Sequence, residues 1–177
     1  KADLQPLFDV RDALREQDLE PAIISGGGTG THNIDTELDL FTELQAGSYT
    51  VMDVQYLAVQ PKAESWSFRS ALVIRATVVS ANHEGSATID AGLKCFATDG
   101  PRPGFASGVP VGAHYEYFGD EHGRVVFTGA NEQLNLGDVV NCVVPHCDPT
   151  INLHDIYHCV RGDTLVDIWP VDARGRH

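Results

Sequence analysis

The chain has 177 residues, of which 42% are hydrophobic, and a formal net charge of −13. This length and apolar fraction are enough for a domain with a real core. The acidic balance and the lack of a basic stripe argue against nucleic-acid binding. No apolar run approaches the roughly 20 residues of a membrane helix. No signal segment opens the chain and the cysteines form no CxxC pair, so we expect reduced thiols in a cytoplasmic protein.

The first segments in chain order predict one αβ unit. Apolar residues recur at helical spacing over residues 4–19, and Pro21 ends that pattern. Residues 22–25 form a short apolar run, which we interpret as a buried strand leading into the glycines of residues 26–30. A helix, a strand and a glycine-rich turn are typical of a parallel sheet or barrel. The chain begins with a lysine inside a helical pattern, which suggests a piece of a longer protein.

From about residue 46 onward, short segments rich in β-forming residues alternate with glycine and proline turns. This pattern predicts an antiparallel barrel or sandwich. The expected strands cover residues 49–54, 67–80, 87–96, 113–118, 124–128, 139–144, 157–161 and 164–169.

The glycine-rich turn is a candidate phosphate cradle. Consecutive glycines leave backbone N–H groups free to point at one anion. Hydroxyl groups at Ser25, Thr29 and Thr31 are further candidate donors. The turn is neither a Rossmann fingerprint nor a P-loop. A flexible turn that only requires positive φ is an equally good interpretation at this point.

The segment that follows the predicted strand 139–144 carries a candidate metal site. If the extended geometry continues, residues two apart share a face, so His146 and Asp148 point together and Cys147 points away. An imidazole beside a carboxylate suits manganese, magnesium, cobalt or zinc. The alternative is a simple hydrogen bond between the two side chains. His154 and His158 lie nearby and are expected to orient neighbours rather than to bind metal.

Taken together, these segments resemble the D-threonine aldolase and D-serine dehydratase family. The resemblance runs from about residue 22 to the end of the chain. It rests on residues 25–31 (Ser-Gly-Gly-Gly-Thr-Gly-Thr), 43–53 (Glu-Leu-Gln-Ala-Gly-Ser-Tyr-Thr-Val-Met-Asp), 92–100 (Gly-Leu-Lys-Cys-Phe-Ala-Thr-Asp-Gly), 144–155 (Val-Pro-His-Cys-Asp-Pro-Thr-Ile-Asn-Leu-His-Asp) and the ending at 166–176.

The resemblance implies an alanine-racemase-like fold, in which a (β/α)₈ barrel carries pyridoxal 5'-phosphate and a β-domain follows. Residues 1–43 are then the last βα units of the barrel, and residues 44–177 are a metal-binding, antiparallel β-domain. The cofactor phosphate is expected on Ser25, Gly26, Gly27, Gly28, Thr29 and Gly30, at the C-terminal face where barrel sites lie. The divalent metal is expected on His146 and Asp148.

The pattern His146-x-Asp148 resembles the aldolase branch of the family, because the dehydratases tend to show His-x-Cys. The implied activity is a lyase that cleaves D-3-hydroxy amino acids, such as D-threonine, to glycine and an aldehyde. The 3-hydroxyaspartate aldolases, the dehydratases of D-serine or 3-hydroxyaspartate, racemisation on the same scaffold, and a non-catalytic β-domain that only dimerises remain alternatives. A zinc hydrolase is a weaker alternative, since it needs a third protein ligand.

One family residue has no counterpart here. The lysine that forms the Schiff base lies near the family's N-terminus, and none of Lys1, Lys62 and Lys94 matches it. The chain is therefore expected to be inactive without the missing N-terminal barrel portion. Lys94 is expected to form an ion pair or a subunit contact, and the expected assembly is a homodimer.

Two further residues, Tyr49 and Asp53, are candidate catalytic residues. If residues 49–54 form a strand, both side chains lie on one face and line the site. A structural hydrogen bond at the domain junction is an equally good interpretation.

Overall fold

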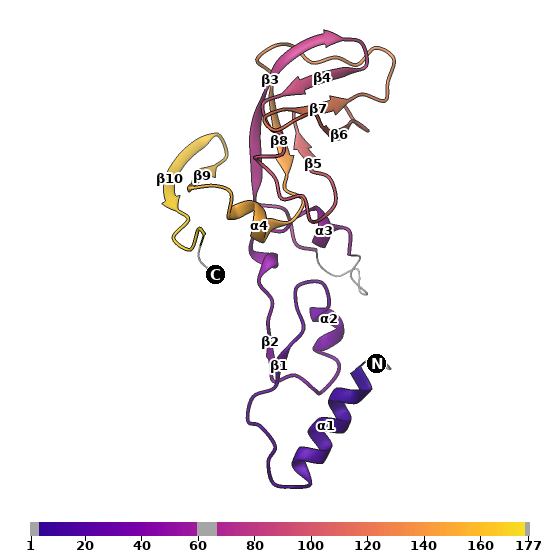
Figure 1. Cartoon of the computed structure of the whole chain (residues 1–177), viewed down its shortest axis with the longest axis vertical. Helices are drawn as coiled ribbons and strands as arrows, with labels where there is room; N and C mark the ends of the chain where they lie inside the picture. The colour runs from indigo at the N-terminus through magenta and orange to yellow at the C-terminus, as the bar shows by residue number, and fades with distance from the viewer. Residues whose placement is uncertain (1–3, 60–66, 176–177) are drawn as a thin grey trace. The chain divides into compact units, whose positions relative to one another are not determined.

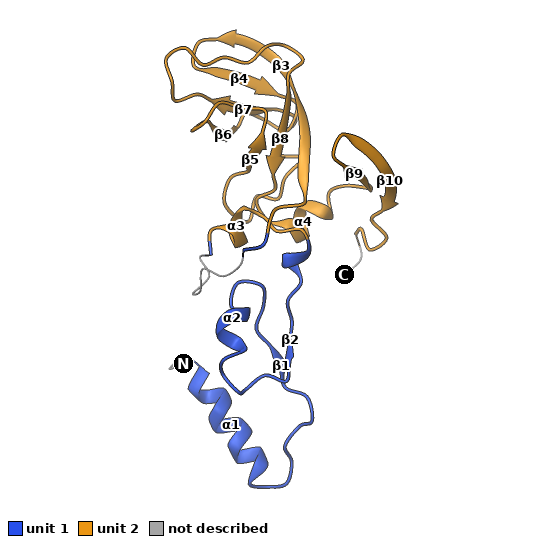
Figure 2. Cartoon of the chain, turned by 180° about the vertical axis from the view of Figure 1, so that it is seen from behind, with its two compact units in different colours: residues 1–50, 59–68 blue, residues 51–58, 69–177 orange. Residues whose placement is uncertain are grey.

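The computed structural model describes residues 4–59 and 67–175, and the chain forms two compact units (Figure 2). Unit one takes in residues 1–50 and 59–68, and unit two takes in residues 51–58 and 69–177. The predicted division between residues 43 and 44 stays a prediction, because compactness alone does not show where a barrel ends. Lys1 and Lys62 lie outside the described residues.

Unit one contains the predicted N-terminal helix and a short parallel pair of strands (Figure 1). Strands β1 and β2 pair with Ser25 opposite Glu43. The glycine turn lies between β1 and α2. The elements are α1 Gln5–Arg15, β1 Ser25–Gly26, α2 His32–Asp35, β2 Glu43–Leu44 and the 3-10 helix η2 Ser48–Thr50.

The apolar side chains of unit one are largely exposed. Helix α1 buries none of its residues, and Val10 on this helix is 58% exposed. The expected buried strand at 22–25 is wrong: only Ser25–Gly26 is a strand, and Ile23 is 64% exposed. A short strand is buried only when neighbouring elements cover both of its faces, and the described part of unit one supplies no such cover.

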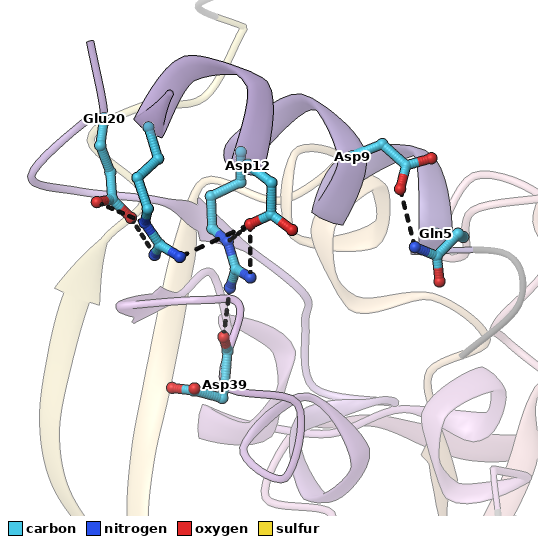
Figure 3. A network of polar contacts seen from close by, with 7 residues as sticks. Gln5, Asp9, Asp12, Glu20 and Asp39 are labelled. Carbon is cyan, nitrogen blue, oxygen red and sulfur yellow. Dashed lines mark hydrogen bonds and ion pairs between the residues drawn. The ribbon is translucent and has the colours of Figure 1, made fainter. Parts of the chain in front are cut away.

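Polar contacts hold α1 to the loops around it (Figure 3). The Arg15 guanidinium donates to Glu20, and Arg11 donates to the backbone oxygen of Asp39 at 2.8 Å. Gln5 donates to Asp9 one turn further along the helix. Exposed contacts of this kind contribute little to stability. Burial of the apolar face of α1 would contribute more.

Unit two is built on a curled, six-stranded antiparallel sheet with the strand order β5-β8-β3-β4-β7-β6 (Figure 1). Strand β3 joins the two halves of this sheet: Val73 to Thr77 pair with β8, and Val78 to His83 pair with β4. The strands are β3 Val73–His83, β4 Ser86–Ile89, β5 Gly104–Ser107, β6 His114–Tyr117, β7 Gly123–Val126 and β8 Val139–Val143.

The concave face of the sheet encloses the core of unit two. Tyr115 lies at its centre, buried, and its hydroxyl donates to the Ala91 oxygen at 2.8 Å. The Phe105 and Tyr115 ring centroids lie 6.3 Å apart, so the two edge strands β5 and β6 approach each other. The buried cluster consists of Ala76, Val78, Ala87, Ile89, Ala91, Phe96, Tyr115, Val125, Val140 and Cys142.

The strand predictions differ from the structure at several places. The strand expected over residues 67–80 begins only at Val73. Residues 49–54 contain η2 and the start of helix α3 Val54–Leu57 instead of a strand. Strand β4 ends at Ile89, and a turn follows at residues 93–95. Strand β5 was not expected, since its Gly104–Ser107 segment carries little β-branched signal and obtains its place by pairing with β8.

A separate hairpin follows the sheet. Strand β9 Ile156–Arg161 pairs with β10 Thr164–Pro170, and every residue of β10 is exposed. Both strands were expected. No helix among residues 4–59 and 67–175 is long and apolar enough to cross a membrane.

Candidate functional site

His146 and Asp148 lie at the start of helix α4 Cys147–Ile151, directly after β8. The expectation that extended backbone continues through Asp148 is wrong. His146 is still extended, with φ −141° and ψ 123°, but Cys147 is already helical. The sequence favours this early turn, because Pro149 in the first helical turn has no N–H to satisfy and Asp148 interacts well with the N-terminal end of the helix dipole.

The His146 imidazole has a carboxylate partner that was not predicted. Its Nδ1 lies 2.8 Å from Asp99 Oδ2, and the hydrogen bond from His146 lowers the pKa of Asp99. A proton held on Nδ1 by an ionised carboxylate leaves the Nε2 lone pair available for a metal ion. The histidine side chain as a whole is 24% exposed.

Asp148 supplies the second candidate ligand, a carboxylate, at the start of the helix. Its side chain is exposed, and its Oδ1 accepts from the Cys147 Sγ at 3.2 Å. Cys147 itself is buried, but its Sγ contact with Asp148 shows that the prediction that it points away from both candidate ligands is wrong. The donor set of one imidazole nitrogen and one carboxylate therefore fits a hard or borderline divalent metal.

The remaining histidines give no third ligand. His154 Nε2 lies 3.0 Å from the Cys95 backbone oxygen, and His158 is exposed on β9. Among the described residues, no group of three or more histidine, cysteine, aspartate or glutamate side chains is placed to hold a metal. A zinc hydrolase with three protein ligands thus has no support from this part of the chain.

The turn at residues 97–100 lies against the segment that carries His146. A Cβ built on Gly100 would lie 3.7 Å from the His146 Cβ. Behind the site, the Ala97 backbone N–H donates to the buried Thr150 Oγ1 at 3.1 Å. Two stretches on which the family resemblance rests, 92–100 and 144–155, are therefore brought together. Their proximity was not deduced from the sequence, because it arises from the long-range pairing of the sheet.

The two candidate catalytic residues differ in environment. Tyr49 lies in η2 of unit one and is 45% exposed. Asp53 is fully buried at the start of α3 in unit two, where both carboxylate oxygens accept backbone N–H groups. The strand alternation that placed them on one face is wrong, and a catalytic role for either stays a prediction.

The glycine turn combines one strained position with one open position. Gly27 has φ +69°, and a Cβ there would lie 2.3 Å from Asp35 Oδ2, so this position requires glycine. A Cβ on Gly28 would meet nothing within 4 Å. Open space beside a glycine backbone fits the approach of a phosphate such as that of pyridoxal phosphate.

The hydroxyl groups of the turn have other partners than expected. Ser25 donates to Glu43 at 2.8 Å, and Thr31 donates to Asp35 at 2.5 Å. The Thr29 hydroxyl accepts from the Tyr49 backbone N–H. Backbone N–H groups, rather than the hydroxyls of Ser25 and Thr31, are thus the donors that fit a phosphate here.

The expected ion pair of Lys94 is confirmed. Its Nζ lies 2.8 Å from Glu121 Oε1, and this contact raises the pKa of Lys94. A lysine used in this way at an exposed position is not a candidate for binding an aldehyde cofactor.

Residues 71–160 match the family model described as "Putative serine dehydratase domain". The chain belongs to this family. The match covers β3 to most of β9 and includes Asp99, His146 and Asp148.

Curated relatives extend the similarity to nearly the whole chain. The chain is 40% identical over 167 residues to a D-threonine aldolase from Arthrobacter sp., covering 92% of this chain and 42% of that protein. It is 36% identical over 169 residues to a 3-hydroxy-D-aspartate aldolase from Paracoccus denitrificans (strain Pd 1222), covering 93% and 43%. The chain thus spans less than half the length of the curated relatives that it matches.

Solved structures confirm the alanine-racemase-like fold. The D-threonine aldolase from Filomicrobium marinum superposes with a TM-score of 0.88 at 36% identity, over 96% of this chain and 46% of that one. An alanine-racemase-like protein from Idiomarina loihiensis gives 0.71 at 21% identity, over 90% and 46%, which supports the fold alone. The antiparallel sheet of unit two is the predicted β-domain.

Proposed function

We propose that this chain is part of a longer lyase, dependent on pyridoxal phosphate and a divalent metal, that cleaves D-3-hydroxy amino acids to glycine and an aldehyde. The observation that carries the proposal is the His146–Asp148 pair at the start of α4, with Asp99 on the far side of the imidazole. The similarity to a D-threonine aldolase and to 3-hydroxy-D-aspartate aldolases supports the reaction class.

Each residue of the pair has a defined part in this proposal. His146 would bind the metal through Nε2 and Asp148 through its carboxylate, while Asp99 keeps the proton on His146 Nδ1. Backbone N–H groups of residues 26–30 would bind the cofactor phosphate. When bound, the metal makes the substrate 3-hydroxyl more acidic, and the cofactor accepts the electron pair of the broken Cα–Cβ bond.

The substrate side chain remains open between two classes. A D-threonine-like substrate carries an uncharged methyl group on Cβ, whereas 3-hydroxyaspartate carries a carboxylate there. Similarity to curated 3-hydroxy-D-aspartate aldolases at 36% identity makes that substrate the second candidate. Aspartate rather than cysteine at position 148 favours cleavage over dehydration, because His146-x-Asp148 resembles the pattern of the aldolase branch.

Partners and location belong to the same proposal. The partners are the small-molecule substrate, a barrel portion that carries the Schiff-base lysine, and a second copy in a homodimer. Exposed apolar side chains on α1 and on the β9–β10 hairpin support such contacts. Four free cysteines agree with a cytoplasmic location. The isolated chain is expected to be inactive, and a non-catalytic dimerisation module is the competing proposal.

Product analysis tests the reaction class. The longer protein is incubated with D-threonine or with D-3-hydroxyaspartate, pyridoxal phosphate and Mn²⁺, and the products are separated by chiral chromatography. Glycine with an aldehyde is expected. A 2-oxo acid with ammonia would replace the aldolase proposal by a dehydratase, and the L-enantiomer would replace it by a racemase.

A further inference from the structure

Asp53 is a fully buried carboxylate whose two oxygens both accept backbone N–H groups. Oδ1 accepts from Tyr56 N at 2.8 Å and thereby caps helix α3. Oδ2 accepts from Cys147 N at 2.8 Å, at the first residue of α4. Burial of a carboxylate costs free energy unless its oxygens are hydrogen-bonded, so these two contacts determine where the Asp53 side chain can lie. Both contacts lie within unit two.

Two backbone hydrogen bonds lie beside the Asp53 carboxylate. Val54 N donates to the Val144 oxygen at 3.0 Å, and Gln55 N donates to the Pro145 oxygen at 3.2 Å. Together with the Asp53–Cys147 bond, they join the start of α3 to every residue from 144 to 147 except His146. The backbone on both sides of His146 is therefore fixed by residues about ninety positions earlier in the sequence.

We propose that Asp53 is a positioning residue for the metal ligands His146 and Asp148. The inference rests on the metal site of the proposed function. Cys147 lies between the two ligands in the chain, so the direction of its peptide N–H affects the placement of both side chains. By holding this N–H, Asp53 determines where extended backbone changes to helix, and so how the imidazole and the carboxylate meet one ion.

Two substitutions separate this link from the cap of α3. Asp53→Asn keeps an oxygen for Tyr56 N but places an amide donor against the Cys147 N–H. Asp53→Ser retains a good N-cap residue for α3, and its single short hydroxyl does not serve both helices. Asp138→Asn is the matched control, because Asp138 Oδ2 accepts from the Asn135 backbone N–H at 2.7 Å in the turn before β8, at the opposite end of that strand from α4.

The test is Mn²⁺ binding to the 177-residue chain, followed by electron paramagnetic resonance, at a temperature where circular dichroism shows each variant to be folded. A group hydrogen-bonded directly to a metal ligand contributes about 10-fold to 100-fold to metal affinity, and this range sets the scale for Asp53, which acts on the ligands through the Cys147 N–H. We expect a weakening in this range for Asp53→Asn and Asp53→Ser, and unchanged binding for Asp138→Asn. Hydrogen exchange should show loss of protection at the Cys147 amide, while the Ala97 amide bonded to Thr150 stays protected.

Each result has a distinct meaning. Wild-type Mn²⁺ affinity in a folded Asp53 variant would overturn the positioning role and leave the proposed function intact. A wild-type chain that binds no more Mn²⁺ than Asp148→Ala would overturn both. If Asp53→Asn does not fold, Asp53→Ser decides. If neither variant folds, Asp53 has a general structural role and the positioning proposal fails.

Discussion

At the residue scale, three hydrogen bonds define the surroundings of the start of α4. Asp99 holds the Nδ1 proton of His146, Cys147 Sγ donates to Asp148, and the Cys147 N–H is bonded to Asp53. These contacts do not involve His146 Nε2 or the second carboxylate oxygen of Asp148. In the proposed function, these two groups would bind the metal ion, and water or substrate would take the remaining positions.

The buried cysteine of β8 gives a prediction in the alkaline range. Burial raises the pKa of the Cys142 thiol from 9.0 to about 12. Below pH 9 the associated stabilisation is fully present, and it is lost as the pH rises toward about 12, since the unfolded chain releases this proton first. We therefore expect Cys142 to resist iodoacetamide at about pH 9 in the folded chain and to react in urea.

Peptide mapping by mass spectrometry measures this reactivity, with the partly exposed Cys159 as the internal control. Equal labelling rates of Cys142 with and without urea would contradict its buried position in the sheet.

Spacing alone identified His146 and Asp148 as candidates, but not their environment. The reason given, strand alternation, was wrong, because Pro149 and the Asp53 contact start a helix at Cys147. Asp99 lies within a stretch that carries the family resemblance, yet its role depends on a contact across 47 positions of sequence. Asp99 and Asp53 each lay in a stretch that carries the family resemblance, 92–100 and 43–53, but neither contact could be read from those stretches.

At the scale of elements, the glycine turn after β1 has the kind of backbone conformation that the sequence indicated. The sequence indicated either a phosphate cradle or a turn with positive φ. Gly27 confirms the positive φ, while the open position at Gly28 leaves the cradle as a proposal. Short strands were less predictable, because β1 and β5 depend on pairing with distant segments more than on local preference.

Gly28→Ala in the longer protein separates the two interpretations of the turn. The added methyl group has room in the fold and occupies the space proposed for the phosphate. Loss of one hydrogen bond to a charged group costs about 1.5–3 kcal/mol, so the Kd for pyridoxal phosphate should rise by about tenfold or more. Absorbance titration measures this Kd.

Gly47→Ala is the matched control, because a Cβ at Gly47 also meets nothing within 4 Å. Unchanged cofactor affinity in Gly28→Ala, at unchanged thermal stability, would count against the cradle.

At the scale of the whole molecule, the two units differ in how much apolar surface they bury. Unit two encloses a core around Tyr115, whereas unit one buries Leu38 and Leu40 but leaves Val10 and Ile23 exposed. This contrast agrees with a chain that spans less than half the length of its relatives. The β-domain could be anticipated from alternation and turns, and helix α1 from helical spacing, while the assignment of unit one to a barrel rests on the family resemblance.

The most direct test of the central claim is the initial rate of glycine formation from D-threonine by the longer protein, after chelation and re-addition of Mn²⁺. We predict that chelation abolishes the rate and that Mn²⁺ restores it in wild type. Mn²⁺ should also restore it in the control Asp163→Ala, at the exposed turn of the hairpin. In Asp148→Ala, the restored rate should be at least about 100-fold lower, which corresponds to about 2.7 kcal/mol. A rate in Asp148→Ala equal to wild type and still sensitive to chelation would contradict the assignment of the metal to this site.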